Sequence, residues 1–214
     1  MSYTKDDGNT SRLTDIKLPF KSVLDETALA SMARGMQGVM DGLLPGWDMD
    51  QSTQDTPRRF AKYLAEFRQP LDIDKIFGST FDDPADHPPM IIQAPIPFRM
   101  VCEHHLLPAI GTAALGYIPH KRVLGLSKLS RLVDAVGTER PSLQEHVANR
   151  IVALMNEHLE PKGVMLVIKS QHGCMACRGV NVQGVDTISS HVTGAFRDNV
   201  SARSEFLSLI NGVL

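Results

Sequence analysis

The second half of the chain holds the feature that most constrains its fold, an ordered series of strand-like and helix-like apolar patterns. Residues 90–101 and 111–118 are typical of strands, and residues 163–170 are typical of a buried strand. Residues 178–188 could form a fourth strand. Two stretches between the strand pairs repeat apolar residues at helical spacing. Their apolar residues are Leu129, Leu132, Val133 and Val136, then Leu143, Val147, Ile151, Leu154 and Met155. The order β-β-α-α-β-β predicts an α+β fold with helices on one face of an antiparallel sheet.

The residues before this series predict a smaller helical region. Apolar residues recur at helical spacing up to Leu43, and a second helix is expected to begin at Thr56 and Pro57. We expect a flexible tail over residues 1–20, an N-terminal helical region over residues 21–88, and the α+β domain over residues 89–214. A last helix is expected at about residues 199–211.

Composition narrows the class of protein. The chain has 214 residues, 43% of them hydrophobic, and a formal net charge of -2, which gives no support for nucleic-acid binding. No apolar run approaches the roughly 20 residues needed to cross a bilayer, so no membrane partner is expected. The polar N-terminus does not resemble a signal peptide, and a cytoplasmic setting is expected. Three cysteines cannot all pair with one another, so metal binding is the better interpretation of a cysteine cluster.

Two short runs concentrate the soft metal ligands. The first is Cys102-Glu103-His104-His105, and the second spans residues 172–178, with His172, Cys174 and Cys177 as its possible ligands. We predict that Cys102, His105 and Cys174 bind zinc with the fourth position open, as in a catalytic zinc site. Residues three apart on a strand face opposite sides, so Cys102 and His105 can share a metal only if the chain turns after Cys102.

The remaining thiol and imidazoles of these runs have more than one interpretation. Cys177 forms a C-x-x-C with Cys174, which could be a closed structural site or a redox pair, although we favour simple packing for Cys177. His104 and His172 would lie beside the metal and could transfer protons near pH 7. Alternatively, one of them only orients a metal ligand.

Several polar residues outside the two runs are candidates for binding an anion or a base. Ser127 is expected to cap a helix that carries Lys128 and Arg131 on one face, which suits a phosphate clamp or a solvated basic face. Arg178 is expected near the metal, and Arg59 and Lys62 belong to a second cationic helix.

The pair Gln144 and Glu145 has two interpretations. The segment from Ser142 to Glu145 fits an S-x-x-E capping box, which spacing alone favours. The alternative is recognition of a base edge, because a carboxylate accepts from two N–H donors at once.

These motifs together resemble the GTP cyclohydrolase I family. The matching segments, in the family's order over roughly residues 22–211, are TPRRFAK at 56–62, CEHHLLP at 102–108, GLSKLSR at 125–131, QE at 144–145, HGC at 172–174, RG at 178–179 and RSEFL at 203–207. The resemblance implies the tunnelling fold. It also implies an enzyme that converts GTP and water to formate and 7,8-dihydroneopterin triphosphate.

The resemblance assigns a role to each candidate residue. By position, Cys102, His105 and Cys174 look like the family's zinc ligands, and His104 and His172 like its proton-transfer residues. The other assignments are Gln144 and Glu145 to guanine recognition, Ser127, Lys128, Arg131 and Arg178 to the triphosphate, Ser127 also to proton transfer at the ribose, and Arg59 and Lys62 to phosphate contacts from a neighbouring subunit. The implied assembly is a decamer of two pentamers, with active sites at subunit interfaces.

Two alternatives remain open from the sequence. One is another tunnelling-fold enzyme acting on purines or pterins, such as a nitrile reductase without zinc or a pterin synthase with a three-histidine site. The mixed cysteine and histidine set argues against both. The other is a non-catalytic protein stabilised by zinc, which a fourth ligand from Cys177 would favour.

Overall fold

The computed structural model describes residues 17–18, 20–82 and 89–214 of the chain. These divide into two compact units, Met1–Pro70 and Leu71–Leu214. Most of the expected N-terminal tail lies outside the described residues. Every described helix is too short or too polar to span a bilayer.

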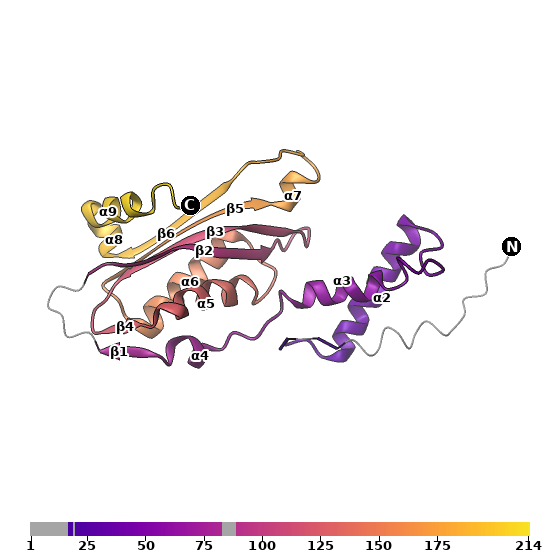
Figure 1. Ribbon diagram of the computed structural model, residues 1–214, viewed down its shortest axis with the longest axis horizontal. Coiled ribbons are helices and arrows are strands. Elements are labelled where there is room, and N and C mark those ends of the chain that lie inside the picture. The colour runs from indigo at the N-terminus through magenta and orange to yellow at the C-terminus, as the bar shows by residue number, and fades with distance from the viewer. Residues whose placement is uncertain (1–16, 19, 83–88) are drawn as a thin grey trace. The chain divides into compact units, whose positions relative to one another are not determined.

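The first unit is built on two helices, α2 (Glu26–Leu43) and α3 (Thr56–Ala65) (Figure 1). Asp25 caps α2 by accepting a hydrogen bond from the Ala28 amide at 2.7 Å. The helices pack through small and apolar side chains, which include Leu29, Ala33, Ala61 and Ala65. Both helices predicted for this region are therefore present, and α3 begins one residue before the position expected from Pro57.

The second unit is built on a four-stranded antiparallel sheet of order β2-β3-β5-β6. Its strands are β2 (Ile91–Val101), β3 (Pro108–Ile118), β5 (Gly163–His172) and β6 (Thr187–Gly194). A two-stranded pair, β1 (Thr80–Asp82) with β4 (Arg122–Leu124), and the short helix α4 (Ile73–Phe77) complete this part of the unit.

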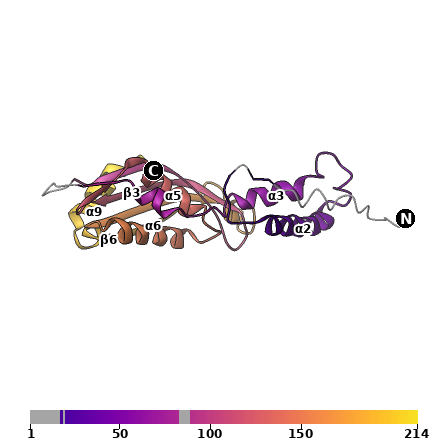
Figure 2. The same cartoon turned by 90° about the horizontal axis from the view of Figure 1, so that it is seen from below.

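Side chains alternate between the two faces of the sheet, and one face holds the main core. Ile96 and Phe98 of β2, Leu115 of β3 and Leu166 of β5 pack there against α5 (Leu126–Gly137) and α6 (Gln144–Leu159). Figure 1 shows these two helices on one side of the sheet, and Figure 2 shows the same layer from below. The predicted α+β class, with the two central helices on one face of an antiparallel sheet, is confirmed.

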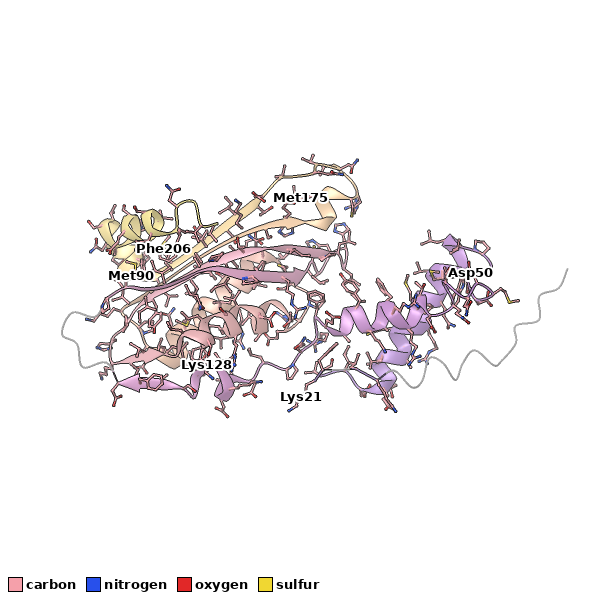
Figure 3. All side chains as sticks on the ribbon, in the orientation of Figure 1. Lys21, Asp50, Met90, Lys128, Met175 and Phe206 are labelled. Atoms are coloured by element: carbon pink, nitrogen blue, oxygen red, sulfur yellow. The ribbon has the colours of Figure 1, made fainter. Side chains whose placement is uncertain are left out.

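The other face of the sheet is covered at one end by the C-terminal helices α8 (Ala195–Asp198) and α9 (Val200–Ile210). Phe206 of α9 is fully buried against Gly116 of β3, where a Cβ atom would lie 2.6 Å from Phe206 Cε2. Phe206 and Met90 lie near the same end of the unit in Figure 3. The expected last helix is present, and glycine at position 116 makes room for its aromatic ring.

The fourth strand lies later in the sequence than predicted. Residues 178–188 are mostly loop, and β6 begins at Thr187. Gly179 and Gly184 have φ values of +62° and +73°, which an extended strand does not allow. The valines of the predicted stretch are exposed, because pairing with β5 starts only where Thr187 meets Ser170.

Candidate metal centre and active site

The loop that joins β2 to β3 makes the turn that a shared metal requires. The Cys102 amide donates to the Leu107 carbonyl at 3.0 Å, and the Leu106 amide donates to the Cys102 carbonyl at 2.9 Å. Leu106 closes the turn with a φ of +54°, a left-handed conformation that costs about 1 kcal/mol for a residue with a side chain. Cys102 is buried at the start of this turn, whereas His104 and His105 are exposed on it.

Strand β5 ends beside the β2–β3 loop, and this positions the third predicted ligand, Cys174, near Cys102. Its last residue, His172, pairs with Ala109 at the start of β3, and the short helix α7 (Gly173–Ala176) follows directly. A Cβ atom on residue 173 would lie 3.0 Å from the Pro108 carbonyl oxygen, so glycine lets α7 approach the β2–β3 loop closely. Cys174, the second residue of α7, is thereby brought to Cys102.

The candidate metal centre consists of Cys102, His105 and Cys174, whose ligand atoms all lie within 4.8 Å of one another. Tetrahedral zinc with sulfur at about 2.3 Å needs ligands about 3.8 Å apart, so a small contraction would close the group around an ion. Burial raises the pKa of the Cys174 thiol, and the neighbouring Cys102 adds to the rise. Two thiols and one imidazole suit a zinc-like cation, and three ligands leave one position open.

Cys177 and Arg178 lie close to this group but differ in what they contact. The Cys177 thiol is exposed and donates to the Gly173 carbonyl at 2.8 Å, and among the described residues it is not part of the metal-ligand group. Arg178 Nη1 lies 2.7 Å from His105 Nε2. The expected proximity of Arg178 to the metal centre is therefore present in the structure.

Backbone hydrogen bonds connect the N-terminus of α6 to the β2–β3 loop of residues 102–107, which we call the metal loop. The Ser142 amide donates to the Val101 carbonyl at 2.9 Å, and the Glu103 amide donates to the Ser142 carbonyl at 3.1 Å. Helix α6 begins at Gln144 with Leu143 as N-cap and no side-chain cap hydrogen bond. The capping-box interpretation is therefore wrong, because Ser142 is held by strand-like pairing with the metal loop, one residue before the N-cap.

This attachment places Gln144 and Glu145 beside His172. Gln144 Oε1 lies 2.9 Å from His172 Nε2. Burial lowers the pKa of His172, and the negative charge of Glu145 opposes that shift. His104 is more open, with its side chain 62% exposed and its ring centroid 6.2 Å from that of His105.

Two serines, the buried Ser170 and the half-buried Ser189, belong to this site and were not found from the sequence. Ser170 donates to Gln144 Oε1 at 2.6 Å, and Gln144 Nε2 donates to Ser189 Oγ at 2.9 Å. The signal was present in the sequence for Ser170, since this hydroxyl follows Val164, Leu166 and Ile168 at every second position facing the core.

The predicted phosphate-binding residues of α5 are not brought to this metal centre. Gly125 rather than Ser127 is the N-cap of α5, and Lys128 donates to the Lys75 carbonyl at 2.7 Å. Gly137, at the opposite end of the helix, contacts the Arg99 carbonyl of β2, near the metal loop. The ten residues from Ser127 to Gly137 span about 15 Å of helix. Lys128 and Met175 of α7 accordingly lie at different places in Figure 3.

Arg131 lies one turn further along α5 and is exposed. The two cations predicted to reach in from a neighbouring subunit, Arg59 and Lys62, lie on α3 in the first unit. Arg59 Nη1 donates to the Ser52 carbonyl at 3.3 Å.

Comparison of the sequence with known protein families identifies the family to which the chain belongs. The family model described as GTP cyclohydrolase I matches residues 43–211, which is well over half of the chain. The chain belongs to the GTP cyclohydrolase I family. This membership agrees with the predicted tunnelling-fold class and covers both runs of metal ligands.

Curated relatives named GTP cyclohydrolase 1 match most of the chain. That of Halalkalibacterium halodurans is 42% identical over 165 residues, covering 76% of this chain and 86% of the relative. That of Drosophila melanogaster is 36% identical over 200 residues, covering 92% of this chain and 60% of the relative. The solved archaeosine synthase QueF-Like in the apo form matches with a TM-score of 0.42 and 20% identity, over 50% of this chain and 95% of that one.

Proposed function

We propose that this member of the GTP cyclohydrolase I family is a GTP cyclohydrolase I. It opens the imidazole ring of the guanine of GTP with water, releases formate and forms 7,8-dihydroneopterin triphosphate. The observation that carries this proposal is the convergence of Cys102, His105 and Cys174 beside His172 and Glu145. Family membership supplies the substrate, and the open three-ligand group supplies a place for hydrolytic chemistry.

The proposed cofactor is zinc, held by Cys102, His105 and Cys174. When bound, zinc supplies the Lewis acidity that makes water a nucleophile near neutral pH. Arg178 lies against His105 and is suited to hold an anionic part of the substrate near the ion. Cys177 lies outside the ligand group in the described structure, which argues against a closed site in a non-catalytic protein.

Two histidines are proposed to move protons. Because burial lowers the pKa of His172, its ring is neutral near pH 7 and can accept a proton from the attacking water or return one to the base. His104 is exposed on the metal loop, within reach of an incoming substrate. The proposed division is that His105 binds the metal while His104 and His172 serve as acid and base.

Glu145 is the proposed guanine-recognition residue. It is exposed at the first turn of α6, close enough to His172 for its charge to act on that ring. A carboxylate at this position can accept two hydrogen bonds from adjacent N–H groups of a guanine edge. The resemblance to the family had assigned Gln144 to the same role.

The triphosphate is proposed to bind residues from more than one copy of the chain. Ser127, Lys128 and Arg131 lie on the first turns of α5, about 9 to 15 Å of helix from the end that reaches the metal loop. A second copy would bring its own α5 to this metal centre. We propose that Arg59 and Lys62 act in the same way and that the assembly is the family's decamer of two pentamers. The cytoplasmic setting stays a prediction.

One assay tests the proposal directly. Purified protein loaded with zinc is incubated with GTP, and the products are oxidised and examined for fluorescent neopterin triphosphate and for formate. Both should appear in equal amounts and be lost when a chelator removes the metal. If zinc-loaded protein formed neither product, the proposed function would be wrong.

A further inference from the structure

Gln144 has an amide group whose hydrogens are both taken up by the protein. The side chain is 1% exposed. Its Nε2 lies 3.3 Å from the Ile168 carbonyl oxygen, 3.3 Å from the Thr187 carbonyl oxygen and 2.9 Å from Ser189 Oγ. Backbone carbonyls can only accept, so the amide nitrogen must face them and the amide oxygen must face the other way.

The amide oxygen of Gln144 is equally occupied. It accepts a hydrogen bond from Ser170 Oγ at 2.6 Å and lies 2.9 Å from His172 Nε2. An amide oxygen cannot donate, so the hydrogen between it and the imidazole must belong to His172 Nε2. In the neutral ring, the hydrogen is therefore on Nε2, and Nδ1 keeps the lone pair.

These contacts leave Gln144 without capacity to bind a base. Its two N–H groups and its two oxygen lone pairs already have protein partners, and the side chain is enclosed. A guanine edge could bind this amide only by displacing one of those partners. Glu145, the next residue, is exposed and can therefore bind a base without displacing a buried partner.

We propose that Gln144 is a positioning residue for His172 rather than a guanine-recognition residue. It holds the imidazole through Nε2–H, which fixes the orientation of the ring and leaves the Nδ1 lone pair without a contact to Gln144. The inference rests on the proposed role of His172 in proton transfer. It changes the role predicted for Gln144 from the sequence and leaves recognition of the base to Glu145.

The rigidity of this arrangement comes from the sheet. Ile168 pairs with Ser189, and Ser170 pairs with Thr187, so the Gln144 amide contacts two residue pairs of the β5–β6 ladder that lie on either side of the Lys169–Ile188 pair. Helix α6 is thereby fixed to both strands beside the imidazole. Loss of the hydrogen-bond partner that orients a metal-binding histidine costs about 10- to 100-fold in activity, and we expect a loss of that order for the partner that orients His172.

The test separates positioning from binding by comparing kcat with KM. In Gln144→Ala, kcat should fall about 10- to 100-fold while KM for GTP stays within about twofold and zinc content is unchanged. If Gln144 instead recognised the base, KM would rise with kcat largely kept, and that result would overturn the proposal. Asn156→Ala is the matched control, because Asn156 joins the other end of α6 to Thr193 of β6 through a side-chain amide. It should leave both constants unchanged.

A second measurement asks whether Gln144 acts through His172. In a His172→Ala background, adding Gln144→Ala should cause no further fall in single-turnover ring opening. If the two losses multiplied instead, Gln144 would act independently of His172 and the proposal would fail. Wild-type protein in the same assay separates this failure from failure of the proposed function, which would leave the wild type inactive on GTP.

A milder variant keeps the proposal testable if Gln144→Ala does not fold. Ser189→Ala removes one acceptor of the Gln144 amide and leaves both carbonyls and Ser170 in place. Its circular dichroism should match that of the wild type, with kcat reduced several-fold and KM unchanged. A Ser189→Ala protein with unaltered kcat would contradict the proposed role of this network.

Discussion

At the scale of single residues, the two thiols of the second run should have different roles. Cys174 belongs to the ligand group, whereas the Cys177 thiol is exposed and bonded to the Gly173 carbonyl. We expect Cys174→Ser to lose the metal and all GTP-dependent product formation. Cys177→Ser should keep a full complement of zinc. Metal content per chain after dialysis measures both, and equal loss of zinc from the two variants would show that the site has four protein ligands.

His104 offers a second test at this scale. Its side chain is 62% exposed, and Glu103 Oε1 is 4.0 Å from its Nε2, so it contributes little to stability. His104→Ala should keep zinc and change the free energy of unfolding by less than about 0.5 kcal/mol. The rate of ring opening should fall about 100-fold or more, as expected for loss of a group that transfers a proton. Retention of the full rate would exclude His104 from the chemistry.

At the scale of elements, packing of α9 on the sheet depends on glycine at position 116, which has no side chain. A Cβ atom at Gly116 would lie 2.6 Å from the fully buried ring of Phe206. Gly116→Ala should therefore lower the free energy of unfolding by about 1–3 kcal/mol through overpacking. Denaturant unfolding measures this change, and zinc binding at the other end of the sheet should be unaffected.

The control for this prediction is a glycine where added volume meets open space. Among the described residues, nothing lies within 4 Å of a Cβ built on Gly35, in the middle of α2. Gly35→Ala should leave stability unchanged or raise it by up to about 1 kcal/mol, because alanine is the better helix former. Equal destabilisation by the two substitutions would mean that general glycine flexibility, and not the Phe206 contact, explains the Gly116 result.

The elements also show how far the sequence could predict the fold and the site. Strand-like apolar runs at residues 90–101, 111–118 and 163–170 were sufficient to place three strands, because both faces of the sheet are covered by apolar residues there. The fourth strand was misplaced, since Val180, Val182 and Val185 have strand-like composition but lie exposed in a loop. Composition does not reveal register with β5, and register decides which residues pair.

The same limit applies to the metal centre and its surroundings. Ligand types and spacing predicted Cys102, His105 and Cys174, which the fold brings together. Spacing could not predict that Ser142 pairs with the metal loop instead of capping α6, because that choice depends on a contact between distant segments. The hydrogen bonds of the Gln144 amide could not be predicted for the same reason, because its partners lie 24 to 45 residues away in sequence.

At the scale of the whole molecule, the separation of the start of α5 from the metal centre supports our proposal that active sites are shared between copies. Ser127 and Lys128 lie about 15 Å of helix from the end of α5 that reaches the metal loop. If each site combines the metal centre of one copy with the α5 residues of another, two differently damaged chains should complement each other. Cys174→Ser lacks the metal but keeps Lys128, and Lys128→Ala keeps the metal but lacks the ammonium group.

The complementation experiment compares each variant alone with the two coexpressed in equal amounts. Each alone should be nearly inactive. In a randomly mixed cyclic assembly, half of the metal centres and half of the neighbouring helices are intact, so roughly a quarter of the sites should be restored. Product formation near that fraction, with each variant still assembling, would support shared sites. Activity no higher than the sum of the separate variants, in oligomers shown to contain both chains, would mean that each copy builds its site alone, and α5 would then need another role.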